Sequence, residues 1–183
     1  MRWVQRDFSC PDCQDGYHLL SEKVAALFAH VLGRGECRSV LKLDVDGTMC
    51  VGRLRWHTLN ASLDWTYLGV AARLDRVALR SSACARALAW HNHTRLVRER
   101  PRFMLGPAYL VGTALLRASR SLAPSGLEDV DTGRRVMSRA HVVPVAIARR
   151  RVGAEVWYHC EADQHAVVFH KCNWTSDPCA ARP

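Results

Sequence analysis

The stretch Ser39-Val-Leu-Lys-Leu-Asp44-Val-Asp46-Gly47 decides how the rest of the chain is interpreted. Its first part, 39–44, predicts a buried strand, because only Lys42 interrupts an apolar run. Asp44 and Asp46 follow at the strand end, where an Asp-x-Asp pair presents oxygen ligands to a hard divalent cation. An alternative stays open, since Asp46-Gly47 is also a common hairpin turn.

A second acidic motif, Leu127-Glu128-Asp129-Val-Asp131-Thr-Gly133, lies far downstream of the first. An acidic side chain placed across a site from a bound cation can take a proton from a substrate hydroxyl. The alternative is a purely structural role, in which these carboxylates only stabilise the N-terminus of a helix.

Helices and strands alternate along the sequence, which predicts a layered α/β domain. At 183 residues and 49% apolar composition, residues 1–183 are expected to form a single domain, and the composition argues against wholesale disorder. The predicted helices are 17–32, with Gly33 as the stop, 113–119 and 128–139. The predicted strands are 39–44, 53–56, 65–70, 141–148, 154–162 and 165–172. Residues 106–111 are predicted to form a tight apolar turn, and residues 70–97 are ambiguous. The region 140–179 is expected to hold terminal strands rich in cysteine and histidine.

The charge is strongly positive, with a formal value of +9. Only Lys23, Lys42 and Lys171 are lysines, so 26 − 3 leaves 23 arginines. Guanidinium groups bind phosphates in a forked geometry, so a polyanionic partner such as a nucleotide-sugar diphosphate is one interpretation. An arginine-rich solvated surface without a partner is the other.

Cysteines and glycosylation sequons favour an oxidising compartment. The chain has eight cysteines and the acceptor sequons at Asn60, Asn92 and Asn173. No apolar leader segment follows Met1, and the nearly apolar run Met104 to Leu116 is too short to cross a bilayer. We therefore expect either a cytosolic protein or a chain that lacks its true N-terminus.

The chain resembles the inverting β-1,3-galactosyltransferase and N-acetylglucosaminyltransferase type of Golgi glycosyltransferases over about residues 7–139. The resemblance rests on motifs in colinear order: Asp7-Phe8, Tyr17, Leu19-Leu20, Lys23, Cys37, Lys42-Leu-Asp44-Val-Asp46, Tyr67-Leu-Gly69, Gly106-Pro-Ala-Tyr109-Leu-Val and Glu128-Asp129-Val-Asp131-Thr-Gly133. It implies a glycosyltransferase-A-like nucleotide-sugar-binding domain without its first strands, that is, the later part of the catalytic domain. A type II membrane anchor would then precede this chain, and the site would face the Golgi lumen.

The resemblance also implies roles for single residues. Galactose or N-acetylglucosamine would move from a uridine-diphosphate sugar to a hydroxyl of a glycan or glycoconjugate acceptor, with inversion. Asp46 would bind Mn²⁺ or Mg²⁺, Asp44 would contact the donor, Asp129 would be the catalytic base and Glu128 would orient it. His159 is the first choice for a histidine metal ligand, and His141, His165 and His170 compete with it.

Other classes stay open. A basic Cys/His-rich binding protein stabilised by zinc, and acting in the nucleus or cytoplasm on nucleic acid or an acidic protein, is the main alternative, although no nucleic-acid partner is expected. A phosphotransferase of the haloacid-dehalogenase type, with Asp44 as the nucleophile, is a further one.

Overall fold

The computed structural model describes residues 19–44, 47–50, 52–54, 62–74, 99–119, 125–145, 147–148 and 168–170. Their helices and strands, in chain order, are α1 (Leu20–Arg34), β1 (Ser39–Leu43), β2 (Gly47–Met49), the 3-10 helix η2 (Leu63–Trp65), β3 (Thr66–Arg73), β4 (Arg102–Gly112), α5 (Thr113–Ala118), α6 (Glu128–Val136), β5 (His141–Pro144), β6 (Ile147–Ala148) and β7 (Val168–His170).

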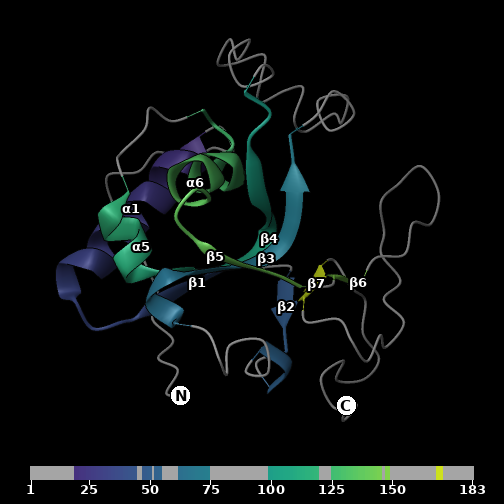
Figure 1. Ribbon diagram of the computed structural model, residues 1–183, viewed down its shortest axis with the longest axis horizontal. Coiled ribbons are helices and arrows are strands. Elements are labelled where there is room, and N and C mark those ends of the chain that lie inside the picture. Colours follow the sequence, from purple (N-terminus) through teal and green to yellow (C-terminus); the bar gives the residue numbers. More distant parts are fainter. Residues whose placement is uncertain are drawn as a thin grey trace.

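The described strands form two sheets. In the larger one, of four strands, the order is β1-β4-β3-β5, with β4 antiparallel to both neighbours and β5 parallel to β3. The smaller sheet has the order β2-β7-β6. Figure 1 shows α1, α5 and α6 gathered on one side of the larger sheet. The predicted α/β class is therefore confirmed at this level.

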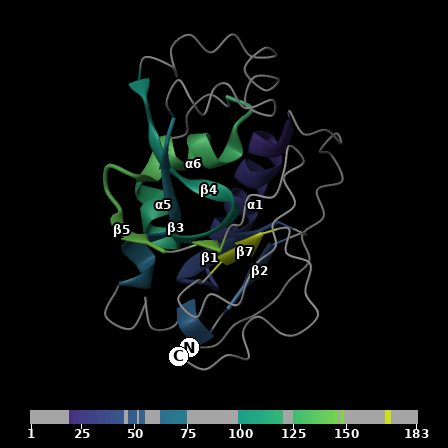
Figure 2. The same cartoon turned by 90° about the vertical axis from the view of Figure 1, so that its right-hand side faces the viewer.

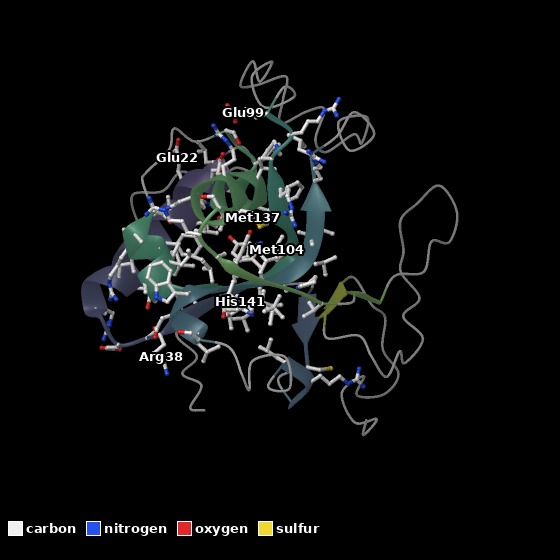
Figure 3. All side chains as sticks on the ribbon, viewed as in Figure 1. Glu22, Arg38, Glu99, Met104, Met137 and His141 are labelled. Carbon is white, nitrogen blue, oxygen red and sulfur yellow. The ribbon has the colours of Figure 1, made fainter. Side chains whose placement is uncertain are left out.

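The main core lies between the larger sheet and the three helices. Its buried members are Val24, Phe28, Val40, Tyr67, Met104, Tyr109, Val111, Leu115, Leu116 and Val136. Helix α6 packs on β4, as Figure 2 shows from the side. Met104 lies fully buried beneath this helix, whereas the labelled Arg38 lies at the periphery (Figure 3). The first turn of α6 is thereby brought over the sheet.

The opposite face of the sheet has its own apolar cluster. Leu68, Ala108, Leu110 and Val145 are buried there against Leu54. Because both faces are covered, neighbouring residues on the central strands point into different cores. This explains why β3 begins with a run of buried residues instead of an alternating pattern.

Several predicted elements agree closely with the structure. The predicted strand 39–44 and the predicted helix starting at Glu128 correspond to β1 and α6, although α6 ends at Val136. The predicted helix 17–32 corresponds to α1, but the glycine that ends it is Gly35. Gly35 has φ +68°, a conformation that favours glycine, and its N–H donates to the carbonyl of Val31.

Other predictions are wrong. Residues 53–54 are helical and not a strand, because the N–H of Leu54 donates to the carbonyl of Cys50 in a helical turn. The predicted strand 65–70 is shifted, since 63–65 form η2 and β3 runs from 66 to 73. The predicted strand 141–148 is divided between β5 and β6, which belong to different sheets. The predicted strand 154–162 and residues 75–97 of the ambiguous segment lie outside the described residues.

The predicted turn at 106–111 is also wrong, because these residues lie inside the eleven-residue strand β4. The pairing with β3 is nevertheless irregular there. Gly69 pairs with Tyr109, whereas Ala71 pairs with Met104, so β4 carries extra residues between the two pairs. Such a bulge frees backbone N–H and C=O groups from the ladder. The glycine at 106 thus marks a real departure from regular structure, but not a reversal of the chain.

Candidate active site

The two acidic motifs meet at the end of β1. The ammonium nitrogen Nζ of Lys42 donates to Oδ1 of Asp44 and lies 3.0 Å from Oε1 of Glu128. Asp44 and Glu128 are 84 positions apart in the sequence, yet one cation contacts both. The structure therefore brings together the two clusters that the sequence analysis singled out separately.

The position of Lys42 follows from the alternation of β1. Val40 and Lys42 are both buried, because residues two apart on a strand share a face. That face looks toward the helices, so the ammonium group is turned inward. A buried cation needs partners, and Lys42 finds the two carboxylates and the carbonyl of Gly106.

Glu128 is held at both carboxylate oxygens. Its Oε1 faces Lys42, and its Oε2 accepts a hydrogen bond of 2.8 Å from the hydroxyl of Tyr109. The same hydroxyl lies 3.2 Å from Oγ1 of Thr132, one turn further along α6. Because Glu128 is buried and doubly bonded, its side chain has a fixed orientation.

Asp129 is fixed in a different way, and it is only partly buried. Its Oδ2 accepts a hydrogen bond of 3.1 Å from the N–H of Gly106, and its Oδ1 accepts one of 2.8 Å from the N–H of Val130. A carboxylate has about four acceptor positions, so capacity for a further donor remains. Asp129 thus combines a fixed orientation with partial access to solvent.

At Gly106 the backbone of β4 takes part in this cluster. Its backbone contributes the N–H that Asp129 accepts and the C=O that Lys42 contacts. A Cβ atom at this position would lie 3.1 Å from Oε1 of Glu128 and 3.4 Å from Oδ2 of Asp129. The β4 bulge therefore supplies backbone groups to the site, and the missing side chain leaves room for both carboxylates.

Asp131 has a structural task. Its Oδ2 accepts a hydrogen bond of 2.7 Å from the N–H of Ser125, which fixes the segment before α6. Its other oxygen lies 3.7 Å from a guanidinium nitrogen of Arg134, three residues later on the helix. A purely structural role at the helix N-terminus therefore fits Asp131. It does not describe Glu128 and Asp129 fully, because both have partners on other elements.

Burial and charge perturb the acids in this cluster. Burial raises the pKa of Glu128 to about 7, against the lowering effects of Lys42 and Tyr109. Burial also raises the pKa of Asp129 to about 6, although N–H donors and Lys42 act in the opposite direction. Burial alone would lower the pKa of Lys42, but Glu128 and Asp44 outweigh it and the net pKa is raised. Such perturbed groups in one cluster are typical of functional sites.

Tyr109 stays a hydrogen-bond donor in this environment. Burial holds the pKa of its hydroxyl well above the ordinary value, and the nearby Glu128 raises it further. Its ring centroid lies 5.9 Å from Nζ of Lys42 and 5.8 Å from the ring centroid of Tyr67, in an edge-on arrangement. Tyr109 therefore lies against both the ammonium group and Glu128, and Tyr67 packs edge-on against the Tyr109 ring.

The predicted metal ligands Asp46 and His159 lie outside the described residues, as do His165 and the cysteines beyond 50. His141 and His170 lie on β5 and β7. In the described part of the chain, no group of three or more His, Cys, Asp or Glu side chains is placed to hold a metal ion. Within those same ranges, no helix is long and apolar enough to cross a membrane.

Sequence reasoning did not assign a site role to Lys42, Tyr109 or Gly106. A signal for Lys42 was present, since a lysine two residues after Val40 falls on the inward face of a buried strand. The contact between Tyr109 and Glu128 depends on how α6 crosses β4, and local sequence patterns do not encode that crossing.

No model of a protein family matches this chain, and the curated proteins contain no match.

Proposed function

We propose that this chain is part of an inverting glycosyltransferase that uses a uridine-diphosphate sugar as donor, and that it contributes the catalytic base. The single observation that carries the proposal is the meeting of Asp44 with Glu128 at Lys42, with Asp129 as the next residue on α6. The donor-side carboxylate and the acceptor-side carboxylates of the resemblance come from separate motifs. Their common location is what a transferase of this kind requires.

Asp129 has the properties of a general base. It is oriented by two backbone N–H groups, it is partly accessible, and its pKa of about 6 lies close to neutral pH. A base with such a pKa is ionised at neutral pH and still accepts a proton effectively. Glu128 is already bonded through both oxygens, so we assign it an orienting role.

In the proposed reaction, Asp129 takes the proton of an acceptor hydroxyl as that oxygen bonds to the anomeric carbon of the donor sugar. The bond from that carbon to the diphosphate breaks, and uridine diphosphate leaves with the electron pair. The sugar is either galactose or N-acetylglucosamine. Attack from the face opposite the leaving group inverts the configuration.

The resemblance also implies a divalent cation. Asp46 and His159 would hold it, and carboxylate oxygen suits Mn²⁺ or Mg²⁺. When bound, such an ion neutralises charge on the diphosphate. Asp44, which is partly exposed, would contact the donor. A disulfide at Cys50 supports the lumenal, oxidising compartment that the resemblance implies.

Release of uridine diphosphate tests the proposal. The full chain is incubated with UDP-galactose or UDP-N-acetylglucosamine and Mn²⁺, with and without a hexose acceptor. We expect the chain to release uridine diphosphate and a chelator to abolish this turnover. Asp46→Asn and Asp129→Asn should each reduce the turnover rate by about 10²-fold or more. The matched control is Asp64→Asn. It makes the same change of side chain in η2, at an ion pair with the exposed Arg38. Full activity of Asp129→Asn, or no turnover of either donor by the unmodified chain, would contradict the proposal.

A further inference from the structure

Lys42 joins three separate segments of the chain. Its ammonium group has three donor hydrogens. The structure gives it three acceptors: Asp44 just after β1, the carbonyl of Gly106 in the β4 bulge and Glu128 at the start of α6. The lysine itself is only 8% exposed. Its hydrogen-bonding capacity is therefore used entirely within the cluster.

Lys42 reaches Asp129 without touching it. The Gly106 residue that accepts from Lys42 through its carbonyl also donates its N–H to Oδ2 of Asp129. Glu128, the other partner of Lys42, directly precedes Asp129 on α6. Movement of the ammonium group would thus disturb Gly106, which donates to Asp129, and Glu128, which precedes it on the helix.

The charge of Lys42 is equally important. Two carboxylates, Asp44 and Glu128, pair with the buried ammonium group, and its charge also acts to lower the pKa of the nearby Asp129. Without this cation the carboxylates would repel one another, and protonation would relieve the repulsion. A buried ion pair contributes little net stability compared with an apolar replacement, so stability alone does not account for a lysine here.

We infer that Lys42 is a positioning residue that ties the donor-side carboxylate to the acceptor-side pair and keeps Asp129 ionised and aimed. This role rests on the proposed function for its catalytic consequence, but its electrostatic part is measurable without any substrate. The structure gives no contact between Lys42 and a substrate, so it is not assigned a catalytic role.

The test is a carboxyl titration of the full chain, labelled with ¹³C at Asp and Glu side chains. The signals of Glu128 and Asp129 are identified by their loss in Glu128→Gln and Asp129→Asn. Lys42→Met keeps the length of the side chain and removes its charge and donors. We expect both midpoints to move to higher pH by about one unit or more, because a nearby opposite charge is lost. Lys42→Arg should keep them near the unmodified values, and so should the control Arg38→Met at the exposed end of β1.

Donor turnover provides the second measurement. In Lys42→Met we expect kcat to fall about fivefold or more at pH 6, with a smaller deficit at pH 8, where Asp129 is mostly ionised in both proteins. A merely structural lysine would give a deficit that does not change with pH. If Lys42→Met does not fold, Lys42→Gln replaces it in both measurements.

The outcomes separate the two proposals. Unmoved midpoints in a folded neutral variant would overturn the role of Lys42, whatever the activity. Moved midpoints in a chain that turns over no donor would support the electrostatic role while overturning the glycosyltransferase proposal. Moved midpoints together with a pH-independent deficit would overturn the catalytic consequence of the role.

Discussion

At the scale of single residues, environment decides what each acid of the second motif does. Glu128, Asp129 and Asp131 occupy one helical turn, yet they face a cation, backbone N–H groups and a preceding loop, respectively. The sequence pattern singles out the motif, and the resemblance predicts Asp129 as the base and Glu128 as the residue that orients it. Neither predicts the observed contacts of the three acids, because each partner comes from a different segment of the chain.

The raised pKa values of Glu128 and Asp129 predict how stability depends on pH. Their ordinary values are 4.5 and 3.8, against about 7 and about 6 in the folded protein. Between these values the folded state binds more protons than the unfolded chain. The stabilisation from these groups is therefore fully present below about pH 4 and is lost as the pH rises through 6 and 7.

Glu128→Gln isolates this contribution, because glutamine does not titrate. Relative to the unmodified chain, we expect its free energy of unfolding to increase between pH 5 and pH 8 by on the order of 2 kcal/mol. Urea unfolding at several pH values measures the difference. A difference that is constant across this range would show that Glu128 has an ordinary pKa. The charged or titratable groups that face this pair from other elements are Lys42 and Asp44 from the β1 segment, Tyr67 from β3 and Tyr109 from β4.

At the scale of elements, hydrophobic periodicity predicted the helices more accurately than the strands. The apolar face of α1 was predictable because Val24 and Phe28 recur at helical spacing and pack into the core. Strand β4 was mistaken for a turn, since Gly106-Pro107 has the composition of one. A bulge tolerates the same residues as a turn does, and only the pairing partners distinguish the two.

The close contact between α6 and β4 depends on Gly133. A Cβ atom there would lie 2.5 Å from both the carbonyl oxygen of Arg102 and Cβ of Phe103. Alanine ordinarily stabilises a helix relative to glycine by about 1 kcal/mol. At Gly133 we expect the opposite, a loss of about 2 kcal/mol or more in the free energy of unfolding, because rigid backbone must move.

Gly33→Ala in α1 is the matched control, because no atom lies within 4 Å of the added methyl group. It should leave the free energy of unfolding unchanged or raise it by up to about 1 kcal/mol. Thermal or urea unfolding of both variants decides the matter. Equal effects at the two glycines would show that Gly133 does not contact Arg102 and Phe103 of β4 closely.

At the scale of the whole molecule, the site lies where the helical layer and the sheet meet. Asp44 belongs to the sheet side and Glu128 to the helical side, and Lys42 holds both. The colinear order of motifs indicated that remote acids belong together, and the structure brings these acids together. The intervening lysine was not predicted, because a salt bridge between layers depends on their relative placement.

A double-mutant cycle tests whether this junction couples the two layers. Lys42→Met leaves the buried Glu128 without its countercharge, and Glu128→Gln removes one of the two carboxylates that pair with Lys42, so each alone should be destabilising. The double variant should be less destabilised than the sum of the two, by about 1–3 kcal/mol, because both charges are then absent.

The reference cycle uses Arg38→Met and Asp64→Asn, an ion pair whose arginine side chain is 68% exposed. Solvent screens that pair, so its two effects should add. Additive effects at Lys42 and Glu128 would mean that the two layers are held together without this ion pair, and the junction would then have no energetic role.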